Sequence, residues 1–429
     1  MSRSRLNRLS STVQRIGYCG MHADMVRTSE GTVRVGSMPD IAKFITEHGF
    51  REETVVVPGW EVSMAGDNRT GEEFVLWQAQ IRGGILKQYV GLRKDIEAVH
   101  RHLERIFPYF FDDANLSIVR KPWLEKWFNP NVAEPVYENG NVEIRCESGN
   151  VLISDRGRVV YDRNGLAASA SPDEDIEALL ETVSRDDAAR EQLEIIPVGC
   201  GNGVFGTVAN TIVRFGREVV WIDPCGYPAH SLARHNIHWD DVTHFLFTHN
   251  HEDHVQGFTA CLRRARKYHR KLKLVMADTA FRVLADLYAP LFPDLHDHVE
   301  LHTMQPGKEL QLGSLRIESR WNHHILPYGT IGLRISGGGR CFGYSGDTKY
   351  DERINSILNR EELKAEWFSG CDLVFHEIEF DNPDSVHSHW KQVESLQQKV
   401  DGRVLGYHTP FLENSPFPLA HEGLRYILD

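Results

Sequence analysis

The heptapeptide Thr248–His254, with the sequence THNHEDH, constrains this chain more than any other stretch. It directly follows Val242–Phe247, a short apolar run with β-branched and aromatic residues that is typical of a buried strand. On a loop that leaves a strand, this spacing lets His249 and His251 reach one cation. Asp253 and His254 then reach a second cation. Imidazole and carboxylate groups suit Zn, Mn or Fe, so the motif predicts a metal site at the end of a buried strand.

Four further candidate residues follow other apolar runs in the second half of the chain. They are His324, Asp347, His376 and His408, which come after Leu315–Trp321, Cys341–Ser345, Asp372–Phe375 and Arg403–Gly406. Strand ends on one edge of a sheet bring such side chains together, so we expect them to converge with the first motif. The combined donors suffice for two cations that share one carboxylate, Asp347. A two-metal site is suited to hydrolysis because a bridging hydroxide is nucleophilic at neutral pH.

The length of 429 residues indicates two or three domains. From Leu193 onward apolar strands alternate with helices, which predicts an α/β domain over residues 193–429. Residues 1–170 contain none of the metal-binding pattern and are interpreted as a smaller α+β module of unknown role. Residues 171–192 are predicted to be a linker with a helix that opens at Ser171 and Pro172. No internal repeat stands out.

The N-terminal module is predicted to contain a helix and a set of hairpins. Four apolar residues share one helical face: Ile96, Val99, Leu103 and Ile106. Turn-forming residues then separate three short runs that look like strands: Val142–Cys146, Asn150–Ile153 and Val159–Tyr161.

Composition excludes several classes of protein. The formal net charge is −12, which argues against a protein that depends on phosphate contacts along a nucleic acid. The seven cysteines are scattered without a C-x-x-C pattern, so neither a disulfide framework nor a zinc finger is expected, and a reducing, cytoplasmic setting is favoured. No uninterrupted stretch of 18 apolar residues occurs, so no membrane span is expected.

Several segments resemble signatures of the metallo-β-lactamase superfamily. The THNHEDH heptapeptide resembles its first metal-binding signature, and Tyr344–Thr348 (YSGDT) resembles its S-G-D-T segment. Three later pairs or triplets are similar in order and spacing to a run in ribonuclease Z and related phosphodiesterases: His376-Glu377, His387-Ser388 and Gly406–His408. The resemblance covers about residues 193–429. It implies an αββα sandwich with two divalent metal ions, Zn as the first choice and Mn or Fe as alternatives.

The resemblance also implies a role for each candidate residue. The first metal would be held by His249, His251 and His324, the second by Asp253, His254 and His408, and Asp347 would bridge the two. His387 resembles the residue that protonates the leaving oxygen, helped by Glu252 or Asp253. His376 would be an outer partner, of the kind that orients a ligand. The predicted catalytic residues are therefore Asp253, His387 and His376.

This sequence departs from the family pattern at two of these positions. The segment after His323-His324 is two residues longer than the third signature of the family, although Pro327 favours His324 over His323 as the ligand. His389 stands where a threonine is usual, so His387 and His389 compete for the role of proton donor.

A third departure concerns the substrate. Ribonucleases Z that bind tRNA through a flexible arm carry that arm between the third-signature histidine and the bridging aspartate. Here His324 and Asp347 are only 23 residues apart, and most of that segment is predicted to be a hairpin. Together with the acidic charge, this favours a small or cyclic phosphodiester over tRNA. We expect a cytoplasmic homodimer that cleaves such a substrate with metal-bound hydroxide, without a membrane or long nucleic acid as partner.

Other activities on the same scaffold remain open, because a fold does not fix a chemistry. They are a tRNA 3′-processing endonuclease, a lactone or ester hydrolase, and a di-iron redox protein. The histidines and glutamate of the 376–388 segment favour phosphodiesters over lactones, and no flavin-binding fingerprint supports the redox alternative. A non-enzymatic role, with residues 1–170 as a regulatory or scaffold part, is the fourth alternative.

Overall fold

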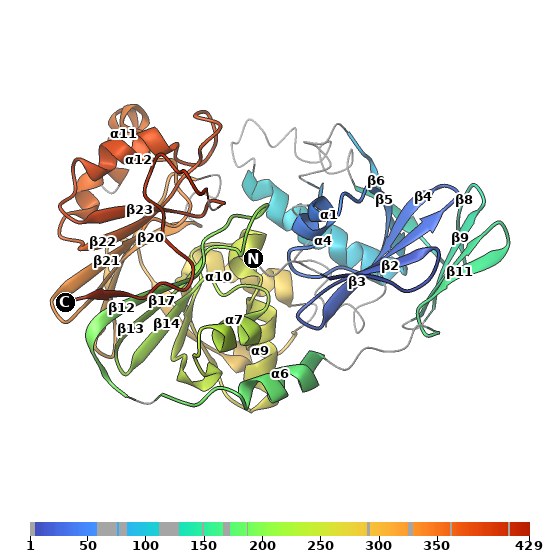
Figure 1. The fold of residues 1–429 in the computed structure, drawn as a ribbon, viewed down its shortest axis with the longest axis horizontal. Coiled ribbons are helices and arrows are strands. Elements are labelled where there is room, and N and C mark those ends of the chain that lie inside the picture. The colour runs from blue at the N-terminus through green and yellow to red at the C-terminus, as the bar shows by residue number, and fades with distance from the viewer. Residues whose placement is uncertain are drawn as a thin grey trace. The chain divides into compact units, whose positions relative to one another are not determined.

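The computed structural model describes residues 5–57, 75–76, 84–110, 128–147, 150–165, 172–186, 188–289, 292–324, 329–360, 363–410 and 412–429. Pro327 and Ser171 lie outside these residues. The chain divides into two compact units, Met1–Leu179 and Leu180–Asp429, which are coloured from blue to red in Figure 1. Within the described residues, each unit has its own sheets and its own clusters of buried apolar side chains.

The larger sheet of the first unit contains seven strands in the order of the chain, β1 to β7. Strands β1 to β4 pair antiparallel, and β4 to β7 pair parallel. Parallel neighbours need crossover connections, and two of these contain the helices α1 (Ile41–Glu47) and α4 (Arg93–Phe110). The strands are β1 (Arg5–Arg8), β2 (Val13–Tyr18), β3 (Met21–Thr28), β4 (Gly31–Val35), β5 (Glu52–Val57), β6 (Lys87–Gly91) and β7 (Phe128–Val132).

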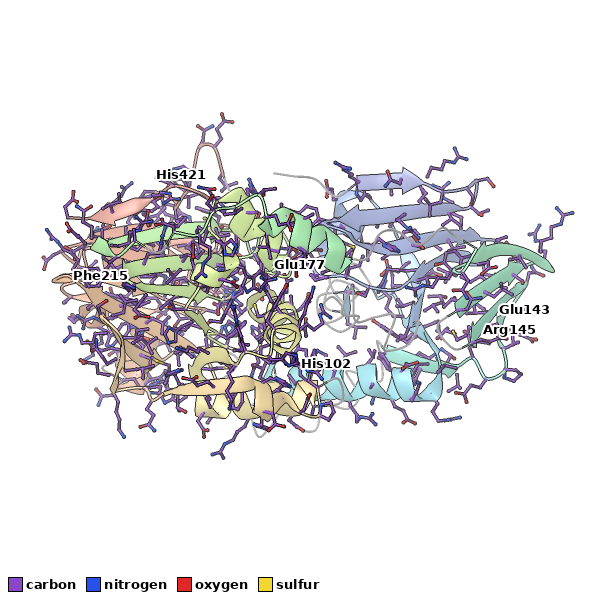
Figure 2. The ribbon with its side chains drawn as sticks, turned by 90° about the horizontal axis from the view of Figure 1, so that it is seen from below. His102, Glu143, Arg145, Glu177, Phe215 and His421 are labelled. Atoms are coloured by element: carbon purple, nitrogen blue, oxygen red, sulfur yellow. The ribbon has the colours of Figure 1, made fainter. Side chains whose placement is uncertain are left out.

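The smaller sheet of the first unit is fully antiparallel and confirms the predicted hairpins. It consists of β8 (Tyr137–Asn139), β9 (Val142–Glu147), β10 (Asn150–Asp155) and β11 (Arg158–Asp162). Its strand β9 alternates strictly, because Val142, Ile144 and Cys146 are buried. Glu143 and Arg145, labelled in Figure 2, are exposed on the other face of β9. The predicted helix is also confirmed, with Ile96, Val99 and Leu103 buried on α4.

Helix α6 (Pro172–Leu180) ends at the sequence boundary between the two units. The second unit contains a seven-stranded sheet in the order β17-β16-β15-β14-β13-β12-β24. The strands are β12 (Arg190–Gly199), β13 (Asn210–Gly216), β14 (Glu218–Ile222), β15 (His244–Leu246), β16 (Leu272–Ala277), β17 (Val299–Met304) and β24 (Tyr426–Leu428). Its connections include α7 (Pro228–Arg234), η1 (Trp239–Asp241), α8 (Glu252–Val255), α9 (Phe258–Lys267), α10 (Asp278–Tyr288) and η2 (Leu295–His298).

A six-stranded sheet completes the second unit. It contains β18 (Glu309–Leu312), β19 (Leu315–Trp321), β20 (Ile331–Gly337), β21 (Arg340–Tyr344), β22 (Leu373–Glu377) and β23 (Arg403–Tyr407), in that order. The connections include α11 (Glu352–Leu358), η4 (Ala365–Phe368) and α12 (Trp390–Gln397). Strands β18 to β21 pair antiparallel, whereas β21, β22 and β23 pair parallel.

The two sheets of the second unit pack against each other, and helices cover their outer faces. On the inner side, the Thr211 hydroxyl of β13 and the Tyr407 hydroxyl of β23 are 2.8 Å apart. On the outer side of the six-stranded sheet, Val393 and Leu396 of α12 join one apolar cluster with strand residues. Helices α11 and α12 lie beside that sheet, and α7, α9 and α10 beside the other sheet (Figure 1). This arrangement is the predicted αββα sandwich.

The seven-stranded sheets of the two units share one pattern of strand directions. In both, three antiparallel pairings are followed by three parallel pairings, and the next four strands along the chain, β8 to β11 or β18 to β21, form antiparallel pairs. Strand β5 occupies the place of β15 in this pattern. No histidine occurs between His48 and His100, so the sequence after β5 lacks the imidazoles that follow β15. The two units therefore share a strand topology but not the histidine-rich motif.

Among the described residues, no helix is both long enough and apolar enough to cross a membrane.

Candidate metal centre

Strand β15 delivers the THNHEDH heptapeptide to one edge of its sheet. The strand ends at Leu246, and helix α8 starts at Glu252, so the intervening loop presents His249 and His251 before the chain turns into the helix. Asp223, at the end of the neighbouring strand β14, fixes this loop. Its carboxylate accepts hydrogen bonds from the backbone amide and the hydroxyl of Thr248, both at 2.7 Å.

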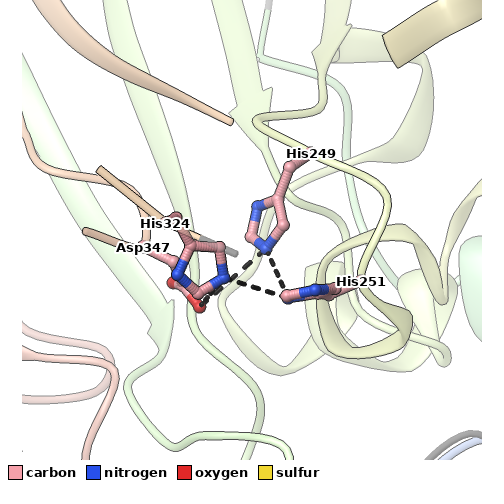
Figure 3. A group of neighbouring side chains, drawn as sticks. All are labelled: His249, His251, His324 and Asp347. Carbon is pink, nitrogen blue, oxygen red and sulfur yellow. Dashed lines mark hydrogen bonds and ion pairs between the residues drawn. The ribbon is translucent and has the colours of Figure 1, made fainter. Parts of the chain in front are cut away.

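Three imidazoles and one carboxylate form the first group of candidate ligands. The Nε2 of His249 lies 3.0 Å from the Nδ1 of His251, and the Nε2 of His324 lies 3.2 Å from that same nitrogen. The Oδ2 of Asp347 is 3.9 Å from both Nε2 atoms. Figure 3 shows the four side chains pointing toward one another from separate segments of the chain. All four are buried.

A second group lies on the other side of the Asp347 carboxylate. The Nε2 of His408 is 3.1 Å from the Oδ2 of Asp253. The Oδ1 of Asp347 lies 3.3 Å from the Nε2 of His254 and 3.7 Å from the Nε2 of His408. Asp347 therefore directs Oδ2 to the first group and Oδ1 to the second, so that a single carboxylate lies between the two.

The backbone around Asp347 is held in an unusual conformation. Gly346 has φ +57°, and a Cβ atom there would lie 2.4 Å from the carbonyl oxygen of Ile331. The side-chain amide of Asn322 donates to the carbonyl oxygens of Ser345 and Asp347, at 2.7 and 2.9 Å. His408 itself is left-handed, with φ +54°, a conformation that costs free energy for a residue with a side chain. These constraints fix where both carboxylate and imidazole point.

Hydrogen bonds to Asp223 and Thr248 fix the tautomers of two candidate ligands, His254 and His249. The Nδ1 of His254 donates to Asp223 Oδ2 at 2.8 Å, which leaves the lone pair of Nε2 directed at Asp347 and Asp253. Because the Thr248 hydroxyl donates to Asp223, its oxygen accepts from the Nδ1 of His249, at 3.0 Å. The Nε2 lone pair of His249 then faces the first group. Outer hydrogen bonds of this kind orient metal-binding histidines.

The protonation of the first group also suits a cation. Burial and the neighbouring imidazoles of His254 and His251 lower the pKa of His249 well below its ordinary value. Burial likewise lowers the pKa of His251 to about 4, although Asp253 and Asp347 oppose the shift. Burial and His251 lower the pKa of His324 as well. These imidazoles are neutral at pH 7, which is the form that binds metal.

The residues fit two divalent cations. Ligand atoms about 2.1 Å from a tetrahedral zinc ion lie roughly 3.4 Å apart, close to the 3.0 and 3.2 Å separations of the first group. Within the part of the chain that the structure describes, the buried Nε2 of His254 and Oδ1 of Asp253 have no hydrogen-bond partner. Such buried polar atoms are costly unless they are satisfied, and a cation held between them would satisfy both.

His387 reaches this centre from a different loop. Its Nδ1 is hydrogen-bonded to Oε2 of Glu377 and lies 3.9 Å from Oδ2 of Asp347. His389 does not reach it, since its imidazole caps helix α12 by accepting from the amide of Lys391. Of the two competing histidines, the structure places His387 at the centre.

His376 lies on the opposite face of strand β22 from Glu377. Its ring is 6.1 Å from that of Tyr350 and 6.2 Å from that of Phe368, and both belong to the apolar cluster under helix α12. Successive residues of a strand point to opposite faces, so only one of this pair can face the metal centre. The structure therefore does not bring His376 to the ligands. Glu252, proposed as a helper, is hydrogen-bonded to Gln256.

Two buried acids that contact candidate site residues were given no individual role from the sequence. Glu377 is buried and accepts from the amide of Thr348 as well as contacting His387. Asp223 is fully buried and has φ +50°. The alternation along Asp372–Phe375 was the available signal for Glu377, and the strand-ending Asp223-Pro224 pair was the signal for Asp223.

The geometry and fold define a metal-dependent hydrolase of the metallo-β-lactamase fold. The family model "Anti-Pycsar protein Apyc1" matches residues 193–414, more than half of the chain, and the chain belongs to this family.

The chain is also similar to individual proteins. The chain is 27% identical over 210 residues to the anti-Pycsar protein Apyc1 of Paenibacillus sp. (strain J14), which covers 46% of this chain and 81% of that protein. It is 24% identical over 168 residues to ribonuclease Z of Thermosynechococcus vestitus, covering 34% of this chain and 38% of that protein. Among solved structures, a diphosphatase from the PhnP family is similar at 17% identity with a TM-score of 0.46, covering 55% of this chain and 97% of that one.

These findings identify the second unit as a metal-dependent phosphoesterase on the metallo-β-lactamase fold.

Proposed function

We propose that the chain hydrolyses a small phosphodiester of the cyclic nucleotide type at a centre of two divalent cations. The first cation is assigned to His249, His251 and His324, the second to Asp253, His254 and His408, and Asp347 is assigned to both. The position of the Asp347 carboxylate carries the proposal, because its two oxygens face two separate sets of buried ligands. When bound, two such cations supply an activated water and stabilise the charge that develops on the attacked phosphoryl group.

His387 is assigned the transfer of a proton to the leaving oxygen. Burial lowers the pKa of His387, but the Glu377 and Asp347 carboxylates outweigh burial and raise it to about 9. The imidazole therefore carries a proton to donate at neutral pH. Its Nδ1 is held by Glu377, which leaves Nε2 for the substrate. We assign the orienting role to Glu377 in place of His376.

The hairpin between His324 and Asp347 favours a small substrate over tRNA. Residues 331–344 of the His324–Asp347 segment are occupied by the strands β20 and β21 and their turn. An arm for tRNA has no place within these strands. The net charge of −12 also disfavours a long polyanion.

Exposed apolar side chains support a substrate with a nucleobase. Phe205, Val386 and Leu412 are 52%, 44% and 39% exposed. Val386 precedes His387, and Leu412 follows the His408 loop. Phe205 lies on the β12–β13 loop, which is joined to that loop by a hydrogen bond from the amide of Thr409 to the carbonyl of Cys200, at 2.8 Å. Aromatic side chains at such positions provide stacking surfaces for bases.

The Phe205 ring is presented on a preformed turn. The Asn202 side-chain oxygen accepts from the amides of Val204 and Phe205, at 2.9 and 2.8 Å, and the amide of Asn202 donates to the carbonyl of Phe205 at 3.0 Å. Exposure of an aromatic ring on a fixed turn has a ready explanation if the ring contacts the substrate.

Zinc, a reducing cytoplasmic setting and a homodimer complete the proposal. Three imidazoles with an oxygen ligand suit zinc in a catalytic site. All seven cysteines are free thiols in the structure, in keeping with a reducing compartment. Metal analysis of the purified protein and light scattering on the intact chain test the metal and the dimer.

A substrate panel tests the function. Purified protein with cyclic mononucleotides, bis-p-nitrophenyl phosphate, a lactone and a tRNA precursor should turn over the first two, and a chelator should abolish turnover. The His251→Ala variant should lose activity and metal, whereas His302→Ala, in a partly exposed contact with Glu300, should keep both. Turnover of the lactone or the tRNA precursor alone would refute the proposal.

A further inference from the structure

Two buried thiols lie side by side in the six-stranded sheet of the second unit. Cys341 is the second residue of β21, and Cys371 lies two residues before β22. Their sulfur atoms are 3.1 Å apart, and the residues are 6% and 2% exposed. Neither belongs to the metal centre.

The pairing of β21 with β22 sets this separation. The amide of Asp372 donates to the carbonyl of Cys341, and the amide of Cys341 donates to Oδ2 of Asp372, both at 2.8 Å. Arg340 also contacts Asp372, at 2.9 Å. A disulfide bond is about 2.05 Å long, so the sulfurs need to move by only about 1 Å, which side-chain rotation can supply.

The surroundings favour a reactive thiolate at Cys341. The hydrogen bond with Cys371 lowers the pKa of Cys341 to about 6 against the opposing effect of burial, with help from Ser336 and Arg334. The pKa of Cys371 is raised, by the same hydrogen bond and by burial. One thiol is thus poised to attack while its neighbour keeps its proton. The Arg334 side chain, which acts on Cys341, is 24% exposed.

We propose that Cys341 and Cys371 form a reversible disulfide when the protein meets a peroxide. The Cys341 thiolate attacks one peroxide oxygen, the O–O bond breaks, and the sulfur becomes a sulfenic acid. The Cys371 sulfur then attacks the Cys341 sulfur, the S–S bond forms, and the S–O bond breaks. The thiol proton leaves with the hydroxyl group as water. In sum, two thiols and one hydrogen peroxide give one disulfide and two water molecules, and a dithiol reverses the reaction.

The crosslink would join the starts of two strands that carry functional groups at their other ends. Strand β21 leads to Asp347, and strand β22 ends at Glu377. Closing the 30-residue segment between the cysteines restricts the unfolded chain. The oxidised protein should therefore unfold at a temperature about 5 °C or more above the reduced protein, with unchanged metal content.

Peptide mapping of the full chain tests this. Protein treated with hydrogen peroxide is denatured, alkylated, digested and analysed by mass spectrometry. We expect one linked pair, Cys341–Cys371, lighter by two hydrogen atoms than the sum of the reduced peptides and absent after dithiothreitol. Cys146 and Cys261, which are equally buried, should be alkylated in full.

Single variants make the result decisive. Cys371→Ser should leave Cys341 as a sulfenic acid that dimedone labels, and Cys341→Ser should leave Cys371 unlabelled. Both substitutions are small, and the unfolding temperature shows whether each variant is folded. Full alkylation of both thiols in peroxide-treated wild type, or equal labelling of the two variants, would overturn the proposal.

Discussion

Asp223 holds Thr248 by two hydrogen bonds of 2.7 Å, one to the backbone amide and one to the hydroxyl. The same carboxylate accepts a hydrogen bond from the Nδ1 of His254. One buried acid, which is not itself in either group of candidate ligands, therefore sets the direction of two imidazoles.

Replacing Asp223 by asparagine should weaken metal binding without removing a ligand. An amide group must direct its NH₂ at one of the donors that the carboxylate now satisfies, so the loop or His254 must turn. Outer partners of this kind change metal affinity by about 10–100-fold, which competition with a coloured chelator measures. Asp278→Asn, at a partly exposed position of α10, is the matched control. Unchanged affinity in Asp223→Asn would contradict the orienting role.

His387→Ala should lower turnover of a cyclic nucleotide by about 10²–10⁴-fold, the usual contribution of a general acid. The loss should be much smaller with bis-p-nitrophenyl phosphate, because nitrophenolate leaves without a proton. His389→Ala removes a helix cap and should reduce stability but spare the turnover number. Equal losses on both substrates would exclude His387 as the proton donor.

Phe205→Ala should raise KM for a cyclic nucleotide about tenfold, because base stacking contributes about 1–3 kcal/mol. Phe205→Trp should retain the low KM. A cyclic ribose phosphate without a base serves as the second control, and its KM should not respond to either substitution. A KM for the nucleotide that is the same in Phe205→Ala and wild type would remove Phe205 from the substrate site.

A comparison of alanine variants at two glycines with positive φ distinguishes the effect of backbone strain from the effect of a steric clash. In Gly346→Ala, the new methyl group meets the carbonyl oxygen of Ile331 at 2.4 Å, whereas in Gly339→Ala nothing lies within 4 Å. Each variant should lose about 1–2 kcal/mol of unfolding free energy because its alanine must adopt a left-handed conformation. Gly346→Ala should therefore lose more unfolding free energy and, because Asp347 follows it, should also lose bound metal. Equal metal content in the two variants would show that Gly346 does not position Asp347.

The stability of the second unit should depend on pH through His244. Burial, His302 and Lys273 lower the pKa of His244 to about 4 from 6.5. Between pH 4 and 6.5, His244 binds a proton in the unfolded chain but not in the folded chain. Its contribution to the free energy of unfolding is therefore fully present above pH 6.5 and is lost as the pH falls to 4. The loss approaches about 3 kcal/mol. Urea unfolding of His244→Gln should lack this part of the slope, and exposed His296→Gln should keep it.

The candidate metal ligands were predictable from the sequence because they follow apolar runs that end at one edge of a sheet. His249, His251 and Asp347 are delivered by short loops after strands of the sandwich, so their convergence follows from the fold class. The helix α4 and the hairpins β9 to β11 were also predictable from the spacing of their apolar residues.

The roles that depend on which face a side chain takes were not predictable. His376 and Glu377 are adjacent in the sequence, and only the register of β22 decides that the glutamate faces the metal centre. The choice between His387 and His389 likewise depends on where α12 begins. The shared topology of the two units could not be predicted from a sequence repeat, since none stands out. Strand directions depend on strand pairing and burial, and many different side chains are compatible with the same pairing and burial.

The location of one carboxylate between two ligand sets has a thermodynamic consequence for metal loading. A first cation held by Asp347 would offset the negative charge that both ligand sets share and would repel a second cation, so the second ion would bind more weakly than the first. Uptake should accordingly proceed in two steps, and half-loaded protein should accumulate during a titration.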